Sequence, residues 1–412
     1  MKGAIVYITL AFASISYGQE PTYIFEDTVN SDNLLKLSSY NTYSSNRFNN
    51  DLIDKFLFGG EITTEIKDKA SSKLGKLNAI GGEFEQRIDS YTPSINMFNK
   101  ERYGLKLSFS DNHYFSANFS TDLFNTAMYG NSPYIGETQD FTFSHAQYLH
   151  YQKFSVGFYD ESNLSSIQLS YVAGSKGLEF GLSESSLLSR STLDTIDVDL
   201  TGAGFMTDTL GPYWAFQGGG FSFDLDYNFI FEGKVKSRQI INFKINNLGV
   251  IFWNKRTDNY IINTHEKYSG FEVSQLLSGD STLFDIDVQD TLNIFHEKRN
   301  YIDVLPIELV VQKLADNGID QKLQAIFGFK TILVPDYFPY LYAGAYYRPI
   351  ENFSVSTRLS YGGFAGVRWG MNINYWLKEK LYFSLGSFDL IGLASKKIGY
   401  GRGLNFSMYY KI

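Results

Sequence analysis

The sequence predicts an all-β fold: a transmembrane antiparallel up-and-down β-barrel of about 12 to 16 strands. Aromatic residues make up 17% of the chain, and only 8 prolines interrupt it. From about residue 218 onward, apolar and polar residues alternate almost continuously. A barrel places aromatic rows on its outer face, and a tilted strand of about nine to eleven residues crosses a bilayer.

Residues 1–18 have the layout of a secretory signal peptide. Lys2 precedes the apolar run "AIVYITLAFASIS", and Ser16 and Gly18 are small residues just before the expected cleavage point. The chain has no Cys, so export without disulfides is expected, which suits a bacterial envelope.

Residues 19–100 are expected to form an N-terminal plug or periplasmic segment, because much of this stretch is polar. Within "NDLIDKFLFGGEITTEIKDKASSKLGK", apolar residues such as Leu52 and Ile53 follow helical spacing. The pattern predicts two short helices separated at Gly59-Gly60, which can plug the lumen.

Residues 101–412 are predicted to form the barrel. The alternation is cleanest in residues 221–231, 353–361 and 365–375. The last two segments are joined by "YGG", a tight hairpin turn. The first exceeds the usual length of a soluble strand, which favours the membrane.

Further strands follow from weaker patterns. "LPIELVVQKLADNGIDQKLQAIFGFKTI" could pass for a helix at its start, but Asn317-Gly318 between two β-rich runs predicts two strands. The final stretch "LNFSMYYKI" also alternates, and in a closed barrel it would be paired on both sides, leaving no edge. Less regular strands are expected near residues 103–111, 113–121, 139–149, 153–160, 165–173, 177–183, 236–246, 257–263, 339–348 and 380–388.

Residues 184–212 and 264–300 are predicted to be long acidic loops, opposite an end with tight turns. Their aspartates can hold Ca²⁺ in principle, but "DSTLFDIDVQD" lacks the Gly and the terminal Glu of an EF-hand loop. We therefore favour the interpretation that these aspartates are solvated charges in the loops.

Composition and motifs exclude several functions. The net charge of −8 argues against a nucleic-acid partner, which requires a basic surface. No HExxH pair places two of the five histidines at metal-ligand spacing, and no GxSxG elbow is present. We therefore expect no catalytic residue, no cofactor and no metal.

The polar rows of the predicted strands should face the lumen. The candidate lumen residues are Asp224, Asp226, Arg358, Arg368 and Asn372. Because both signs of charge occur, these residues can pair across the interior, so a wide open pore is disfavoured. A purely structural role for these groups and a role in transport both remain open.

Several segments together resemble a family of Bacteroidota outer-membrane barrels known only as a domain of unknown function. They are "INNLGVIFWNKRTDNY" (245–260), "YRPIENFSVSTRLSYGGFAGVRWGMNINYW" (347–376) and "SLGSFDLIGL" (384–393). "NRFNNDLIDKFLFGG" and "FSTDLFNTAMYGN" are similar to the N-terminal half of that family. More distantly, the layout resembles the long-chain fatty-acid transporter class, which includes PorV-like barrels of type IX secretion. This resemblance implies a barrel of about 14 strands.

This resemblance implies an outer-membrane protein that is not an enzyme and that binds or passes a small, hydrophobic ligand. The alternative is a surface scaffold that docks partner proteins, as in type IX secretion. An outer-membrane lipid hydrolase and a secreted soluble β protein are less favoured. The expected partners are outer-membrane lipid, the barrel-insertion machinery, and either a hydrophobic small ligand or a secretion partner protein.

Overall fold

The computed structural model describes residues 22–23, 33–97, 100–189, 195–232, 238–268, 294–316, 321–335, 337–377 and 380–412. The signal peptide expected at residues 1–18 and the hairpin turn expected at Asn317-Gly318 lie outside these ranges.

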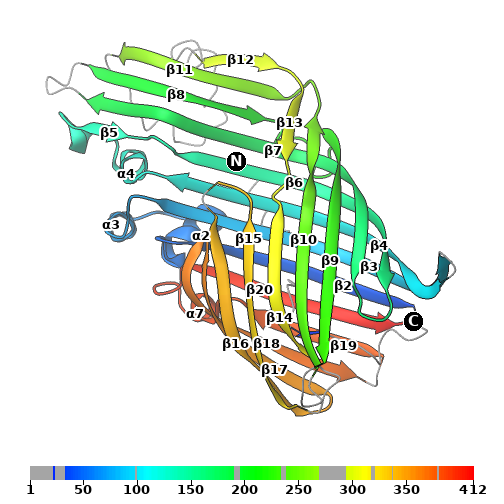
Figure 1. Ribbon diagram of the computed structural model, residues 1–412. Coiled ribbons are helices and arrows are strands. Elements are labelled where there is room, and N and C mark those ends of the chain that lie inside the picture. The colour runs from blue at the N-terminus through cyan, green and yellow to red at the C-terminus, as the bar shows by residue number, and fades with distance from the viewer. Residues whose placement is uncertain are drawn as a thin grey trace.

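Fourteen antiparallel strands close into a barrel (Figure 1), which confirms the predicted fold class. In Figure 1, strands of the N-terminal half run across the view and β14 to β16 run down it, so the two walls of the barrel cross. In order around the ring, the strands are β2 (Leu34–Ser45), β3 (Asn78–Met97), β4 (Lys100–Phe119), β6 (His145–Asp160), β7 (Ser166–Ser189), β9 (Gly218–Glu232), β10 (Arg238–Trp253), β14 (Glu308–Asp316), β15 (Leu323–Ile332), β16 (Phe338–Ile350), β17 (Phe353–Gly363), β18 (Ala365–Leu377), β19 (Leu381–Ser387) and β20 (Gly401–Lys411).

The ring closes between its first and last strands. β20 pairs with β19 on one side and with β2 on the other, where Leu34 lies opposite Lys411 and Ser44 lies opposite Gly401. The prediction for "LNFSMYYKI" is thus confirmed. Closure leaves no unpaired backbone edge along this strand.

Side chains alternate between a buried polar row and an exposed apolar row. On β9, Phe221 and Phe229 are exposed, whereas Ser222 and Asn228 are buried. The same alternation holds on β17 and β18. A soluble β-sandwich would show the reverse order, so the exposed apolar rows indicate a surface that contacts lipid.

The two ends of the barrel differ in their connections. At one end the turns are short, for example residues 161–165 between β6 and β7. At the other end, most connections are long and hold the helices α2 (Asn50–Phe58), α3 (Thr64–Ser71), α4 (Thr121–Tyr129) and α7 (Leu390–Ala394), and the 3-10 helix η1 (Ser132–Tyr134). The exceptions are the β15–β16 connection, residues 333–337, and the tight β17–β18 turn, where Gly362 and Gly363 have φ values of 102° and 69° that favour glycine.

The predicted helices are confirmed as α2 and α3. The Thr63 side chain caps α3 by accepting a hydrogen bond from the Ile66 N–H, and Gly59 ends α2 with a φ of 80°. Leu52 and Ile53 of α2 are fully buried in a cluster shared with α4. Among the described residues, no helix is long and apolar enough to span a membrane.

A sheet extension continues beyond the ring at the long-connection end. It contains β5 (Thr138–Asp140), β8 (Ile196–Met206), β11 (Asp258–Tyr268) and β12 (Ile294–Lys298), built on the far half of β7. Two more short strands pair with ring strands: β13 (Tyr301–Val304) with β10, and β1 (Thr22–Tyr23), in parallel, with β14.

The expected domain boundary at residue 101 is wrong, because β2 and β3 are ring strands and the barrel begins at Leu34. The signal was hidden because the lumen-facing row of β3 carries long charged side chains, including Glu83, Arg87 and Asp89. Such a row gives this strand the composition of a soluble segment.

The expected loops at 184–212 and 264–300 are partly strand. β7 runs on to Ser189, and β8 follows with Ile196 and Val198 packed against Phe141. In both segments the alternation of apolar and polar residues was hard to recognise, because aspartates occupy the solvent-facing row. Residues 269–293 of the second segment lie outside the described ranges.

The lumen as a candidate functional site

The barrel encloses a cavity of about 260 Å³ whose wall is mostly polar. Its lining comes from ring strands, chiefly β2, β3, β4, β6, β7, β9, β10 and β14. Within the described chain, neither α2 nor α3 contributes a lining residue. Side chains of the barrel wall therefore bound this cavity, and the helices that were expected to plug the lumen do not.

Most charges in the cavity are paired. Lys153 Nζ lies 2.7 and 2.8 Å from the two carboxylate oxygens of Asp224. Lys244 Nζ lies 2.8 Å from an oxygen of Asp226, and Arg87 Nε lies 2.7 Å from an oxygen of Asp89. Each pair is held in a setting of low dielectric, where buried charges require partners.

One ion pair crosses the lumen. Lys330 on β15 lies 2.8 Å from Glu83 on β3 and also contacts Glu308 on β14. β15 and β3 are opposite each other in the ring of fourteen strands. The two walls are thus close enough for one side chain to bridge them, which excludes a wide aqueous pore at this level.

An apolar layer closes the lumen toward the long-connection end. Phe364, from the β17–β18 turn, packs against Tyr114 of β4, with ring centroids 6.4 Å apart. The buried members of the layer are Ala79, Tyr114, Leu149, Tyr151, Val172, Phe205, Ile251, Trp253, Leu305, Ile332 and Phe364. They come from the ring strands β3, β4, β6, β7, β10 and β15, from β8 and from two connections, so they form a layer across part of the interior.

The β6–β7 turn covers the short-turn end of the cavity. Leu164 has a φ of 57°, a left-handed conformation that is uncommon for a residue with a side chain. It packs against two clusters on separate strands, one with Leu34 and Tyr159 and the other with Ile240 and Leu314. The turn is also anchored, because the Asn228 amide donates to the Asn163 carbonyl oxygen at 2.9 Å.

The structure places all five predicted lumen residues on inward-facing rows. Asp224 and Asp226 line the large cavity. Arg358 and Arg368 line a second space of about 20 Å³, where Arg358 lies 4.2 Å from the Phe388 ring centroid. Asn372 is also buried, but among the described residues it lines neither of the two spaces.

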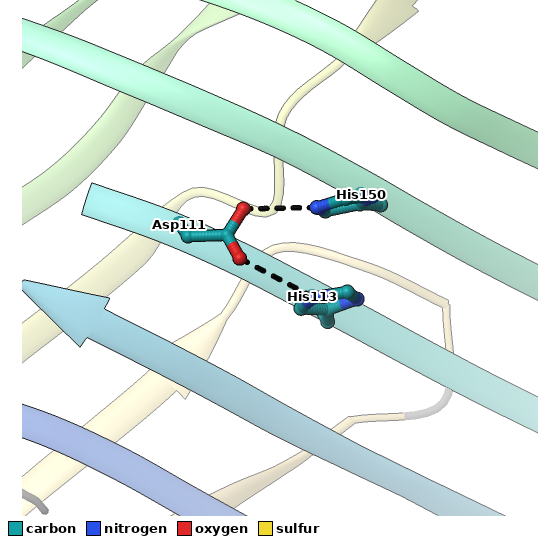
Figure 2. Close-up of side chains that lie close together, drawn as sticks. All are labelled: Asp111, His113 and His150. Atoms are coloured by element: carbon teal, nitrogen blue, oxygen red, sulfur yellow. Dashed lines mark hydrogen bonds and ion pairs between the residues drawn. The ribbon is translucent and has the colours of Figure 1, made fainter. Parts of the chain in front are cut away.

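Sequence reasoning missed a cluster on the outer face of the wall (Figure 2). It contains Asp111 and His113 of β4 and His150 of β6, whose ligand atoms lie within 4.8 Å of one another. His113 and His150 are directly paired in register. Only this pairing brings them together, so the separate stretches "DNH" and "HYQ" gave no local signal.

Hydrogen bonds join this cluster to the loop before β9. The Tyr213 hydroxyl donates to Asp111 Oδ2 at 2.9 Å and accepts from His113 Nε2 at 2.7 Å. Burial, and then the charge of Asp111, raises the pKa of Tyr213 above its usual range, so this phenol keeps its proton. Gln152 and His150 donate to Asp111 Oδ1 at 2.7 and 2.9 Å.

The cluster does not present a formed metal site. The two imidazole rings are stacked, with centroids 4.0 Å apart and planes 7° from parallel. An imidazole binds a metal in its own plane, about 2 Å from the nitrogen, so two stacked rings cannot both reach one ion without rotation of one ring. The contacts instead favour a role in fixing Tyr213 and its loop.

Comparisons with known proteins give one family and several distant structures. The model of a family of unknown function, DUF5723, matches residues 33–385. The toluene transporter TodX of Pseudomonas putida has 9% identity, a TM-score of 0.37, and coverage of 97% of this chain and 94% of its own. The toluene transporter TbuX of Ralstonia pickettii has 8% identity, a TM-score of 0.37, and coverage of 95% and 92%. A FadL homologue of Pseudomonas aeruginosa has 10% identity, a TM-score of 0.35, and coverage of 93% and 91%. No curated protein sequence matches.

Proposed function

Because the chain belongs to DUF5723, a family of unknown function, we propose a function from the lumen itself: an outer-membrane barrel that takes a small solute into its interior and passes it across. The observation that carries this proposal is the cavity of about 260 Å³ inside the wall. The apolar layer with Phe364 lies on one side and the Leu164 turn on the other. This arrangement suits a holding site between two closures.

The exposed apolar rows support placement in a membrane. Leu359 and Tyr361 on β17 and Val367 on β18 are more than 60% exposed, at 62%, 63% and 71%. Water would oppose so much exposed apolar surface, whereas lipid removes the cost. In the outer-membrane setting that we propose, lipid is the partner of these rows and the insertion machinery delivers the chain.

The cavity lining favours a solute with polar groups. A hydrophobic ligand in the cavity would displace water from Arg87, Lys153 and Glu83 and could offer these charged groups no hydrogen bond in return. This loss of hydration is costly in free energy. A small polar solute can exchange hydrogen bonds with the same groups. We therefore favour polar solutes over hydrophobic ones for the interior route.

Passage is tested with purified protein in lipid vesicles and a small neutral sugar such as ribose. Replacing Leu164 with Gly and Phe364 with Gly removes one apolar contact group from each closure. Either single change should raise ribose uptake only slightly, because the other closure remains, whereas the double variant should raise it at least tenfold. Leu210→Gly, on an exposed loop residue, is the matched control. A double variant that inserts correctly but admits no ribose would refute the proposed route.

Docking of a partner protein is the second candidate, and the sheet extension favours it. β12 pairs with β11 alone among the described strands, and Ile261 and Phe295 on this hairpin are exposed. A strand with one free side can accept a further strand from another chain. If no lumen variant transports any solute, this function replaces transport.

A further inference from the structure

We propose that the lumen cavity contains a binding site for a small hydrophilic anion, centred on Lys106. The anionic group is a carboxylate or a phosphate. This inference rests on the proposed function in that it names the class of solute held by the same cavity.

Lys106 differs in its partners from three other cations of the cavity, Arg87, Lys153 and Lys244. Its Nζ lies 3.1 Å from the Ser166 hydroxyl and 5.3 Å from the centre of the Tyr91 ring. Within the described chain, no carboxylate oxygen lies within the 4.0 Å of an ion pair. Arg87, Lys153 and Lys244 each have such a carboxylate.

Lys153, on the neighbouring strand of the same wall, is a lysine whose charge is fully paired. Lys153 is 2% exposed and contacts both oxygens of Asp224 as well as the Asn247 side chain. Lys106 is 7% exposed, yet it has one hydroxyl and one ring. A buried ammonium with no carboxylate in direct contact is costly, because Asp89 and Asp226 act on it only from a longer range, and an anion in the cavity would supply a direct counter-charge.

The surrounding residues leave space for such an anion. Lys106 lies opposite Gly157 of β6, which projects no side chain into the lumen. Lys36 lies opposite Asp89, two residues along β3 from the Tyr91 that faces Lys106. The two lysines thus flank β3, with Cα atoms about 12 Å apart, so their long side chains can approach one bound group from both sides.

The chemistry of the cavity limits what else the ligand carries. Gln168 and Asn112 line the same space and can bond hydroxyl or further acidic oxygens. Although Phe84 and Tyr151 also line the cavity, more of its exposed lining is polar than apolar, which disfavours a long acyl chain. The ligand class is therefore a compact organic acid or a phosphorylated small molecule.

The two buried arginines do not offer an equal site. Among the residues that the structure describes, Arg358 has no hydrogen-bond partner at Nε or Nη2, and Arg368 has none at Nε. However, Phe388 and Tyr342 cover Arg358, Tyr340 covers Arg368, and the adjoining space is only about 20 Å³. Aromatic faces compensate these charges in part, and an organic acid does not fit there.

The test measures binding of inorganic phosphate and of citrate to the purified, folded barrel by calorimetry at constant ionic strength. We expect saturable binding of at least one anion, weakened at least tenfold by Lys106→Gln and unchanged by Lys298→Gln, a control at an exposed lysine of β12. Phosphate binding alone would assign a phosphoryl group, and citrate binding alone would assign a carboxylate. Equal binding by the wild type and Lys106→Gln, or no binding by either, would overturn the proposal.

A second measurement separates a binding role from a structural one. In buffer without these anions, Lys106→Gln should unfold at the same temperature as the wild type or higher, because it removes an unpaired buried charge. Lys153→Gln should unfold at a lower temperature, because it leaves Asp224 without its partner. If Lys106→Gln is destabilised as much as Lys153→Gln, Lys106 has a structural partner and the proposal fails.

Ribose uptake by the double closure variant separates this inference from the proposed function. Uptake without anion binding would retain transport and reject the anion site. Anion binding without uptake would retain the site and reject transport.

Discussion

The Lys330 bridge gives the sharpest prediction about stability. Replacing Lys330 with Met keeps most of the side-chain volume but removes the positive charge that contacts both Glu83 and Glu308. The Lys330 side chain is 5% exposed, and those of the two glutamates are 19% and 10% exposed, so solvent screens this interaction little. Breaking a buried ion pair by removing one partner costs about 3–5 kcal/mol.

Lys330→Met should therefore lower the free energy of unfolding by about 3–5 kcal/mol. The assay is urea unfolding in lipid vesicles, followed by the gel mobility of unboiled protein. Adding Glu83→Gln and Glu308→Gln to the same chain should recover most of the loss, because no unpaired carboxylate remains. A loss below about 1 kcal/mol for Lys330→Met alone, as for an exposed pair, would refute the reasoning that the two walls are joined by a buried bridge.

Three further outcomes follow from the structure. Leu359→Arg places a charge near the middle of an outward row and should cost about 2–4 kcal/mol in the same urea assay, whereas Leu359→Phe should cost little. Tyr213→Phe removes a donor to Asp111 and should speed proteolysis within residues 207–217 several-fold, with no change in the heat needed to unfold the barrel; an unchanged cleavage rate would show that the loop is held by other contacts. Addition of Zn²⁺ should leave the unfolding temperature unchanged, because the stacked His113 and His150 rings cannot share an ion; a saturable rise would show that one ring rotates to bind.

The sequence predicted features that depend on local alternation. On β9 and β17, outward Phe and Tyr residues alternate with inward Asp, Asn and Ser, and this period gave both the strands and the lumen row. The short helices were predictable for the same reason, because Leu52, Ile53, Phe56 and Leu57 follow helical spacing. Pairing of β20 on both sides followed from the physical cost of an open edge.

Features that depend on register and on contacts across the barrel were beyond local patterns. Nothing in the sequence near Glu83 indicates that Lys330, on the opposite wall, is its partner. Likewise, His113 and His150 become neighbours only through the register of β4 and β6. The apolar layer was hidden because each strand contributes only one or two of its members.

β7 connects the sheet extension outside the ring with the cavity inside the barrel. Residues 166–174 of this strand pair with β9 in the wall, and residues 178–189 pair with β8 in the extension. The strand bends at an irregularity in its pairing with β6, where Ser175 donates to Gln152.

One continuous backbone thus joins a surface outside the ring to Ser166, the hydroxyl that Lys106 contacts. Because β7 belongs to both sheets, a displacement of the extension would have to be absorbed at the irregularity around Ser175 or in the wall beside the cavity.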